Sequence, residues 1–266
     1  MFELNGDARV IAFRDIKGRS AIIVDDFYRD PDEVRELALS LKYGDGLKLK
    51  GGFPGVRGSL GTPEVKEKLY NIYLDLCNNK LWKIRHQPTQ LLPDGSFKIP
   101  LLKKERPFDV VEFEKNWNNQ GFMVNVTNDN FMVKNPLGII PHQDYWEDEE
   151  PTNQFGSVIY LNTPDECAGG TNLYSRNGEM SFPKREQTWD STMESWMHEL
   201  SGIETDIEKF KYIRMKIDEN NPFVCEFKAE MKYNRMVLYQ ADVFHSADLD
   251  LGMFTDYHRI NQIFFM

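Results

Sequence analysis

Hydrophobic and polar residues in the first part of the chain predict a strand and then helices. The run 20–28, SAIIVDDFY, is apolar through its middle, which is typical of a buried strand followed by a turn. Residues 30–33, Asp-Pro-Asp-Glu, supply an N-cap, a proline at the first helical position and acids in the first turn, so a helix is predicted to run to about Leu41. Glycine and lysine dominate 44–61, which predicts a loop, and residues 62–64, Thr-Pro-Glu, predict the start of a second helix.

From Gly121 onward the pattern changes to short apolar runs separated by glycine, proline and aspartate. Such runs predict strands, and their shortness favours a barrel or a sandwich. The runs cover residues 122–126, 157–162, 171–174, 235–239 and 259–265, and 138–142 leads into a further strand. Between 176 and 228 a capping box at Ser191 and apolar residues at helical spacing interrupt the strands, and a short helix is predicted over 206–213. We interpret this segment as an insertion rather than a second domain.

The charge of the chain argues against two classes of partner. The formal net charge is −10 and the pI is about 5.1. A nucleic-acid partner is therefore not expected, because such binding depends on cations that neutralise phosphates. A membrane partner is not expected either, since anionic lipid would repel the chain and no apolar run reaches the roughly 20 residues that cross a bilayer.

Cysteine usage and the N-terminus predict a cytoplasmic location. Cys77, Cys167 and Cys225 are scattered and form no CxxC motif, which argues against a disulfide framework and against a thiolate zinc site. The first residues alternate polar and apolar side chains and carry acids, so no signal peptide is predicted. A small molecule or a peptide is the expected partner, and the oligomeric state is left open.

The triplet His142-Gln143-Asp144 is the main chemical feature of the chain. On a strand, residues two apart point to the same face, so this imidazole and this carboxylate would converge. His245 follows the strand predicted over 235–239 and offers a second imidazole. Two neutral imidazoles and one carboxylate on one face of an octahedral ion form the triad of non-haem Fe(II) oxygenases, with three positions left open for a co-substrate and O2.

A surface pair is the alternative interpretation of His142 and Asp144, because the acidic residues 147–150 follow them. Two further features favour the metal site. Arg259 lies on the last predicted strand, and its guanidinium can bind a carboxylate through two hydrogen bonds, which suits the distal carboxylate of 2-oxoglutarate. Gly169-Gly170 permits a tight turn into a strand beside the site.

A set of motifs spread along the chain resembles a known family. They are Asp25–Tyr28, Asp30-Pro31, Val34-Arg35, Pro54–Arg57, His142–Asp144, Tyr160–Asn162, Gly169–Thr171, Tyr233–Arg235, Phe244–Ser246, Gly252 and Arg259–Phe265. Together they resemble the 2-oxoglutarate/Fe(II)-dependent dioxygenase superfamily, and within it the DUF6445 family, which is related to the prolyl-hydroxylase-like branch. The resemblance spans about residues 20–266 and is weakest over 176–228.

The resemblance implies a fold that is mostly β with flanking helices, built on a double-stranded β-helix core of the jelly-roll or cupin-like type. It also implies an iron site at His142, Asp144 and His245. We expect one oxygenase domain over 1–266, with a flank of helices and strands at 1–118 and a partly helical insertion at 176–228. Residues 119–175 and 229–266 would form the β-helix core.

Five other residues are candidates for binding. Asn125, Tyr160 and Thr171 could hydrogen-bond 2-oxoglutarate, although a strand tyrosine is more often a core residue with a satisfied hydroxyl. Arg57 follows a Pro-Gly turn and could bind a substrate carboxylate, with a surface ion pair as the alternative. Trp146 follows the metal ligands and could form a wall of the pocket, with plain packing as the alternative.

The expected reaction is hydroxylation of a C–H bond in an amino-acid, peptidyl or small natural-product substrate, with release of succinate and CO2. The resemblance implies hydroxylation, or another oxidation, rather than halogenation, because Asp144 supplies the carboxylate that related halogenases replace with a small residue. Two alternatives stay open. One is a cupin-like binding or structural protein without turnover, and the other is a triad oxygenase that needs no 2-oxoglutarate, against which Arg259 argues.

Overall fold

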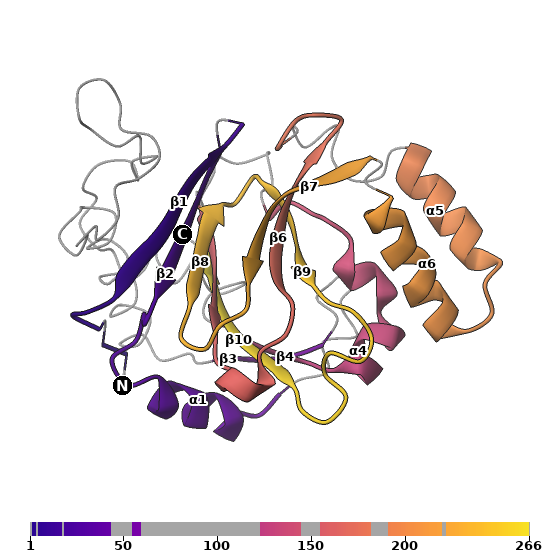
Figure 1. Ribbon diagram of the computed structural model, residues 1–266. Helices are drawn as coiled ribbons and strands as arrows, with labels where there is room; N and C mark the ends of the chain where they lie inside the picture. Colours follow the sequence, from indigo (N-terminus) through magenta and orange to yellow (C-terminus); the bar gives the residue numbers. More distant parts are fainter. Residues whose placement is uncertain are drawn as a thin grey trace, which may run out of the picture.

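The structure, a computed structural model, consists mostly of antiparallel β-sheet with helices at its flanks (Figure 1). It describes residues 2–3, 5–17, 19–43, 55–59, 123–144, 155–181, 191–219 and 222–265. The predicted helix that begins at 62–64 lies outside these residues, as does Trp146.

The larger sheet has seven strands, and all neighbouring strands in it are antiparallel. Their spatial order is β1 (Arg9–Ile16), β2 (Arg19–Asp25), β8 (Met236–Gln240), β5 (Phe155–Tyr160), β10 (Arg259–Phe265), β4 (Met123–Thr127) and β3 (Val56–Ser59). Residues paired across antiparallel strands face the same side. Ile23, Val237, Val158 and Ile263 are paired in this way from β2 to β10 and form an apolar row in the core.

The smaller sheet has three strands in the order β7 (Phe223–Glu230), β6 (Gly170–Arg176) and β9 (Phe244–Asp248). Two glycines, Gly169 before its middle strand and Gly170 at the start of that strand, are required by the neighbouring strands. A Cβ atom on Gly169, whose φ is +65°, would lie 2.0 Å from the carbonyl oxygen of Asp248 on β9. A Cβ atom on Gly170 would lie 2.0 Å from the carbonyl oxygen of Ala229 on β7. The predicted tight turn into this strand is therefore confirmed, and no residue with a side chain fits at either position.

The two sheets face each other, as three contacts between them show. The Tyr160 hydroxyl on β5 donates to Thr171 Oγ1 on β6 over 2.7 Å. The Arg259 Nη2 on β10 donates to the carbonyl oxygen of Gly170 over 3.3 Å. The ring of Tyr239 on β8 packs on the ring of His245 on β9, with 4.5 Å between the centroids. Side chains that alternate inward from both sheets therefore share one interior space.

Helices lie beside this pair of sheets. They are α1 (Pro31–Ser40), α4 (Asp129–Lys134), the 3-10 helices η2 (Pro136–Ile139) and η3 (Pro164–Glu166), α5 (Ser191–Ser201) and α6 (Asp206–Asp218). In the view of Figure 1, α1 lies below the sheets and α4, α5 and α6 lie at one side. Helix α1 is attached through Arg35, which donates to both carboxylate oxygens of Glu166 and to the carbonyl oxygen of Leu161. Within the described part of the chain, no helix combines the length and the apolar character needed to cross a membrane.

Several predicted elements are confirmed with small shifts at their ends. The predicted strands 122–126, 157–162, 171–174, 235–239 and 259–265 correspond to β4, β5, β6, β8 and β10. The helix predicted from 31 to about 41 is α1, and the two helices predicted after Ser191 and over 206–213 are α5 and α6. These elements were predictable because the spacing of apolar residues within each segment is typical of a strand or of a helix.

Other predictions were wrong because tertiary contacts decide the structure there. The segment 138–142 was predicted to lead into a strand, but among the described residues η2 occupies its first part and only His142 pairs, as an isolated bridge. The range 44–61, predicted as a loop, contains β3, which adds to the edge of the larger sheet. Asp30 precedes α1, but its side chain makes no capping hydrogen bond. Strand β7 begins at Phe223, inside the range 176–228 that we interpreted as an insertion, and pairs with β6.

A buried carboxylate ties the N-terminal hairpin to the larger sheet and yields a stability prediction. Asp25 is 4% exposed and accepts hydrogen bonds from Arg235 and from Lys232. Burial raises the pKa of Asp25, but the two cations outweigh it and hold the pKa below its usual value. The carboxylate therefore stabilises the fold above the ordinary carboxyl range, and this contribution is lost as the pH falls through the lowered pKa.

Asp25→Asn should lower the free energy of unfolding at pH 7 by about 3 kcal/mol, because it leaves a buried guanidinium without its counter-charge. Urea unfolding followed by circular dichroism measures this value. The exposed Asp256→Asn is the matched control and should change it by less than about 0.5 kcal/mol. A difference between Asp25→Asn and the wild type that stays constant down to acid pH would contradict this account.

Candidate metal centre

The backbone places the two histidines of the predicted triad directly opposite each other. The His142 N–H donates to the His245 carbonyl oxygen over 2.9 Å, and the His245 N–H donates to the His142 carbonyl oxygen over 2.8 Å. This is the hydrogen-bonded pair of an antiparallel ladder, in which opposed side chains leave on the same side. The Asp144 N–H then donates to the Ala241 carbonyl oxygen over 3.0 Å, so the segment stays alongside the β8–β9 connection. The three residues thus meet although 138–142 is not a regular strand.

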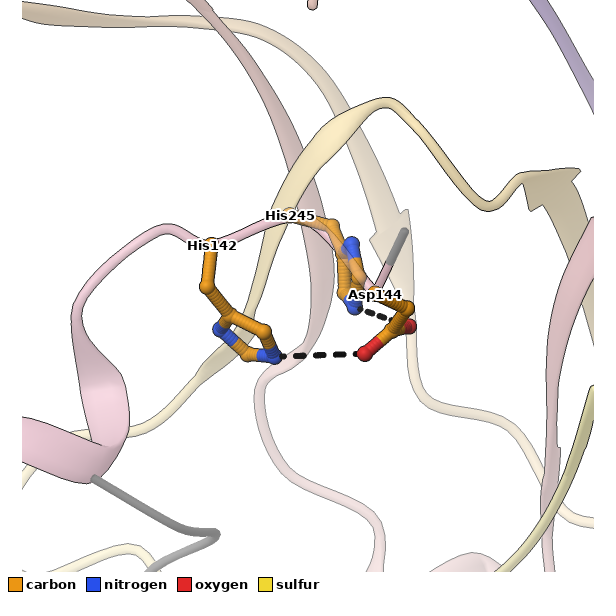
Figure 2. Close-up of side chains that lie close together, drawn as sticks. All are labelled: His142, Asp144 and His245. Carbon is orange, nitrogen blue, oxygen red and sulfur yellow. Dashed lines mark ion pairs between the residues drawn. The ribbon is translucent and has the colours of Figure 1, made fainter. Parts of the chain in front are cut away.

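The three side chains converge on one point (Figure 2). The His245 Nε2 lies 3.0 Å from Asp144 Oδ2, and the His142 Nε2 lies 3.8 Å from Asp144 Oδ1. One ligand atom from each residue lies within 4.8 Å of the others. His245 is 7% exposed and Asp144 16%, whereas the His142 side chain is 51% exposed. The group is therefore compatible with metal binding, with its open side at His142.

Backbone carbonyls fix which ring nitrogen of each histidine can bind a metal. The His142 Nδ1 lies 3.1 Å from the Ile140 carbonyl oxygen, and the His245 Nδ1 lies 2.9 Å from the Val243 carbonyl oxygen. A carbonyl oxygen only accepts, so Nδ1 must carry the proton in both contacts. A neutral imidazole then has its lone pair on Nε2, the atom directed at Asp144. This is the outer hydrogen bond that metal-binding histidines usually make.

Asp144 behaves as a carboxylate that needs a cation. Its Oδ2 is buried and accepts no hydrogen bond of good geometry from the described residues, although His245 Nε2 is near. Burial raises the pKa of Asp144, but the charges of His245, His142 and Arg57 outweigh this, so the net pKa is lowered. Burial lowers the pKa of His245, and the Asp144 carboxylate outweighs it, so that net pKa is raised. Two lone pairs and a carboxylate that face one another repel unless a proton or a metal ion lies among them, and a metal ion satisfies all three.

Arg259 forms a second cluster in the same interior. Its side chain is 2% exposed, its Nη1 donates to Asn261 Oδ1, and its guanidinium lies 5.6 Å from the centre of the Tyr160 ring. Burial lowers the pKa of Arg259, yet a guanidinium keeps its charge at physiological pH. Within the described ranges no carboxylate forms an ion pair with it, and its Nε has no hydrogen-bond partner. This buried positive charge can therefore bind an anion.

The backbone on both sides of Arg259 is held by one side chain. Asn162 Nδ2 donates to the His258 carbonyl oxygen over 2.7 Å, and Asn162 Oδ1 accepts from the Ile260 N–H over 2.6 Å. Asn162 is fully buried, so these bonds are protected from water. The position of the guanidinium is thus fixed by the connection after β5 as well as by β10.

Tyr239 joins the triad to the Arg259 cluster, and the sequence analysis missed it. Its ring packs on His245, and its pairing with Gly156 puts it on the same face of the larger sheet as Tyr160, which lies beside Arg259. Burial raises the pKa of Tyr239 well above its usual value, so the phenol stays protonated. The triad and Arg259 therefore both face the interior between the two sheets. The alternation of β8 could have indicated that Tyr239 points inward, but not that it meets His245.

The remaining predicted residues occupy distinct places. Tyr160 and Thr171 hydrogen-bond each other beside Arg259. Asn125 on β4 is paired with Asn261 on one side and with Arg57 of β3 on the other. Asn261 was missed too, although its position two residues after Arg259 puts it on the same face of β10.

Comparisons with known proteins give limited information. The model of a family of unknown function, DUF6445, matches residues 125–256, which include the triad and end before Arg259. No curated protein matches the chain. Among solved structures, an N-substituted L-amino acid dioxygenase from Burkholderia ambifaria AMMD is similar with a TM-score of 0.38 and 11% identity, over 92% of this chain and 81% of that chain. A TM-score of this size does not establish a common fold, so the function of this chain must be inferred from its own side chains.

Removal of any triad residue should weaken divalent metal binding. His142→Ala, Asp144→Ala and His245→Ala each remove one of three converging ligand atoms, so Mn(II) affinity measured by isothermal titration should fall by about 100-fold or more. His198→Ala, on the exposed face of α5, is the control and should bind Mn(II) as the wild type does. Equal affinity in all four variants would place the metal elsewhere.

Proposed function

We propose that this chain is a non-haem oxygenase that binds Fe(II) and 2-oxoglutarate and oxidises a C–H bond of an amino-acid, peptidyl or small natural-product substrate. The observation that carries the proposal is a buried guanidinium, Arg259, that lies between the same two sheets as the three converging ligand atoms. When bound, Fe(II), 2-oxoglutarate and O2 supply the oxidation, with succinate and CO2 as co-products.

The donor set fits Fe(II). His142, Asp144 and His245 would hold the ion through two imidazole nitrogens and one carboxylate oxygen. This combination is typical of non-haem Fe(II) oxygenases, because it leaves positions open for a chelating co-substrate and for O2. The unprotonated Nε2 atoms and the buried Asp144 Oδ2, which has no hydrogen-bond partner among the described residues, support a bound cation.

The Arg259 cluster fits the distal carboxylate of 2-oxoglutarate. The guanidinium is pinned by Asn261 and by the Gly170 carbonyl oxygen, which leaves its Nε without a partner among the described residues. Tyr160 and Thr171 would complete the wall around this carboxylate, because their hydroxyls lie on the two sheets that face each other. A hydrogen bond to a charged group contributes about 1.5–3 kcal/mol, so this anchor is a large part of the co-substrate affinity.

The order of the strands supports a double-stranded β-helix. From β4 onward the chain alternates between the sheets: β4 and β5 belong to the larger sheet, with His142 bridged to the smaller sheet between them. Strands β6 and β7 belong to the smaller sheet, β8 to the larger, β9 to the smaller and β10 to the larger. Such alternation is expected when two sheets wind around one interior, as in jelly-roll folds.

A non-catalytic cupin-like protein is the alternative function. It would keep the metal ligands, but it would have no need for a buried cation without a described carboxylate partner. Formation of succinate from 2-oxoglutarate in the presence of O2 separates the two, because a binding protein forms none above the level of free Fe(II).

Anaerobic addition of 2-oxoglutarate to the Fe(II)-loaded protein should produce a weak visible charge-transfer band, because the 2-oxo acid chelates the metal. Arg259→Gln should weaken 2-oxoglutarate binding about 10- to 100-fold, from the loss of a charged hydrogen bond, and should leave Fe(II) affinity unchanged within about twofold. Pyruvate lacks the distal carboxylate, so the preference for 2-oxoglutarate over pyruvate should largely disappear in this variant.

Control variants distinguish a specific loss of binding from a general loss of folding. Arg29→Gln removes an exposed arginine and should leave both affinities unchanged. Arg259→Lys keeps the charge and should retain part of the preference for 2-oxoglutarate. A folded, Fe(II)-loaded wild-type protein that shows no band would contradict the co-substrate assignment.

A further inference from the structure

A cavity of about 440 Å³ lies between α6 and the face of the smaller sheet that points away from the candidate metal centre. Thr171 on β6 bonds to Tyr160 of the larger sheet, so it points into the interior, and the next residue, Asn172, points outward. Small-molecule sites typically have volumes of about 300–1,000 Å³, so the cavity is large enough for a metabolite. Its lining includes Asn172 and Tyr174 of β6, Cys225 and Lys228 of β7, and Arg214 and Asp218 of α6.

The carboxylates in and beside this cavity each have a cation of the protein as a partner. Arg214 binds Asp218 through Nη2 over 2.9 Å and Asp248 through Nη1 over 3.3 Å. Glu226, which also lines the cavity, accepts a hydrogen bond from Lys17. A cationic ligand would have to displace one of these internal partners, so the cavity is better suited to a ligand that is neutral or anionic.

Asn172 supplies the floor of the cavity with a buried acceptor. Its side chain is 2% exposed, and its Nδ2 donates to the Tyr174 hydroxyl over 3.3 Å. Its Oδ1 is also buried, and no group in the part of the chain that the structure describes donates a hydrogen bond to it. A buried amide oxygen that is left without a donor is destabilising, so the site favours a ligand that brings an N–H or O–H group.

Lys228 supplies a cation at the mouth of the same cavity. It is paired with Asn172 across β7 and β6, so the two side chains leave on the same face of the sheet. The Lys228 side chain is 58% exposed, and its Nζ lies 3.8 Å from Asp248 Oδ2, which is longer than a hydrogen bond. An ammonium has three donors, so Lys228 can bind an anionic group of a ligand while it stays near Asp248. The acceptor and the cation thus lie on neighbouring strands.

We propose that this cavity is a second ligand site, which binds a small organic anion with an N–H or O–H donor close to its carboxylate or phosphate group. Lys228 binds the anionic group, and Asn172 Oδ1 accepts from the donor. The site is separate from the candidate metal centre, because the His245 ring packs on Tyr239 of the larger sheet and therefore lies on the other face of the smaller sheet. The proposal consequently goes beyond the oxygenase function and does not depend on it.

Protection of Cys225 from iodoacetamide tests the site, because Cys225 lines the cavity. The probes are N-acetylglycine, which carries a carboxylate and an N–H donor, and glycerol 3-phosphate, which carries a phosphate and O–H donors. At least one of them should slow alkylation of Cys225, followed by peptide mass spectrometry, and which one does so identifies the anionic group. Their uncharged counterparts, N-acetylglycinamide and glycerol, should bind at least about tenfold more weakly, because they lose the charged hydrogen bond to Lys228. Cys167, which does not line the cavity, is the internal control.

Variants test the two contacts separately, with affinities measured by isothermal titration of the same probes. Lys228→Gln should weaken binding of the anionic probe about 10- to 100-fold, and Lys228→Arg should restore part of the loss. Lys211→Gln removes an exposed lysine of α6 outside the cavity and is the matched control. N-acetylsarcosine lacks the N–H donor, so it should bind more weakly than N-acetylglycine, and Asn172→Ala should remove this difference.

Three results would overturn the second ligand site. The first is that neither anionic probe binds the wild type. The second is that the charged and uncharged members of a pair bind equally well. The third is that Lys228→Gln binds the anionic probe as tightly as the wild type does, which would place the probe elsewhere. None of these results bears on 2-oxoglutarate binding, so the ligand site and the proposed function can fail independently.

Discussion

The site depends on one pair of backbone hydrogen bonds, those that His142 and His245 exchange. This pair brings together residues from distant parts of the chain and fixes them directly opposite each other. Because opposed residues in an antiparallel pair leave on the same side, the two imidazoles have to share one space. Asp144, two residues after His142, is kept in register by its own backbone bond to Ala241. The relative position of the three residues is therefore set by main-chain contacts.

The groups around this backbone pair determine the protonation of the two histidines and the position of the nearby positive charge. Two further carbonyl oxygens hold the Nδ1 protons, which leaves both Nε2 lone pairs directed at a buried carboxylate. On the opposite sheet, Asn162 holds the backbone on both sides of Arg259, so a positive charge faces the same interior. Gly169 and Gly170 allow the start of β6 to lie close to its neighbours β7 and β9. The candidate cation site and the positive charge of Arg259 are thus fixed on facing sheets by groups that do not themselves bind a ligand.

The sequence predicted those parts of the site that depend on local pattern. The spacing of His142 and Asp144 and the place of Arg259 on a strand of clear period could be identified along the chain. The register between strands could not, because it is set by pairing of distant segments. For that reason Tyr239, Asn261 and strand β9 were missed, and the edge strand β3 was taken for a loop.

The same reason explains why the alignment of four polar residues across the larger sheet could be found only in the structure. They are Tyr160, Asn261, Asn125 and Arg57. They lie on four strands and have no common spacing in the chain, although each one is an ordinary polar residue on a strand. Once the register is known, their alignment follows from pairing alone. The local sequence shows which residues are polar, and the strand register decides which of them lie next to each other.

Diffraction at the iron edge from crystals grown anaerobically with Fe(II) tests the central claim most directly. The account predicts one anomalous peak, about 2.0–2.2 Å from His142 Nε2, from His245 Nε2 and from a carboxylate oxygen of Asp144, by analogy with other metal–imidazole and metal–carboxylate bonds. An iron peak away from these three atoms, ligation through Nδ1, or no peak at the triad in crystals saturated with Fe(II) would contradict it.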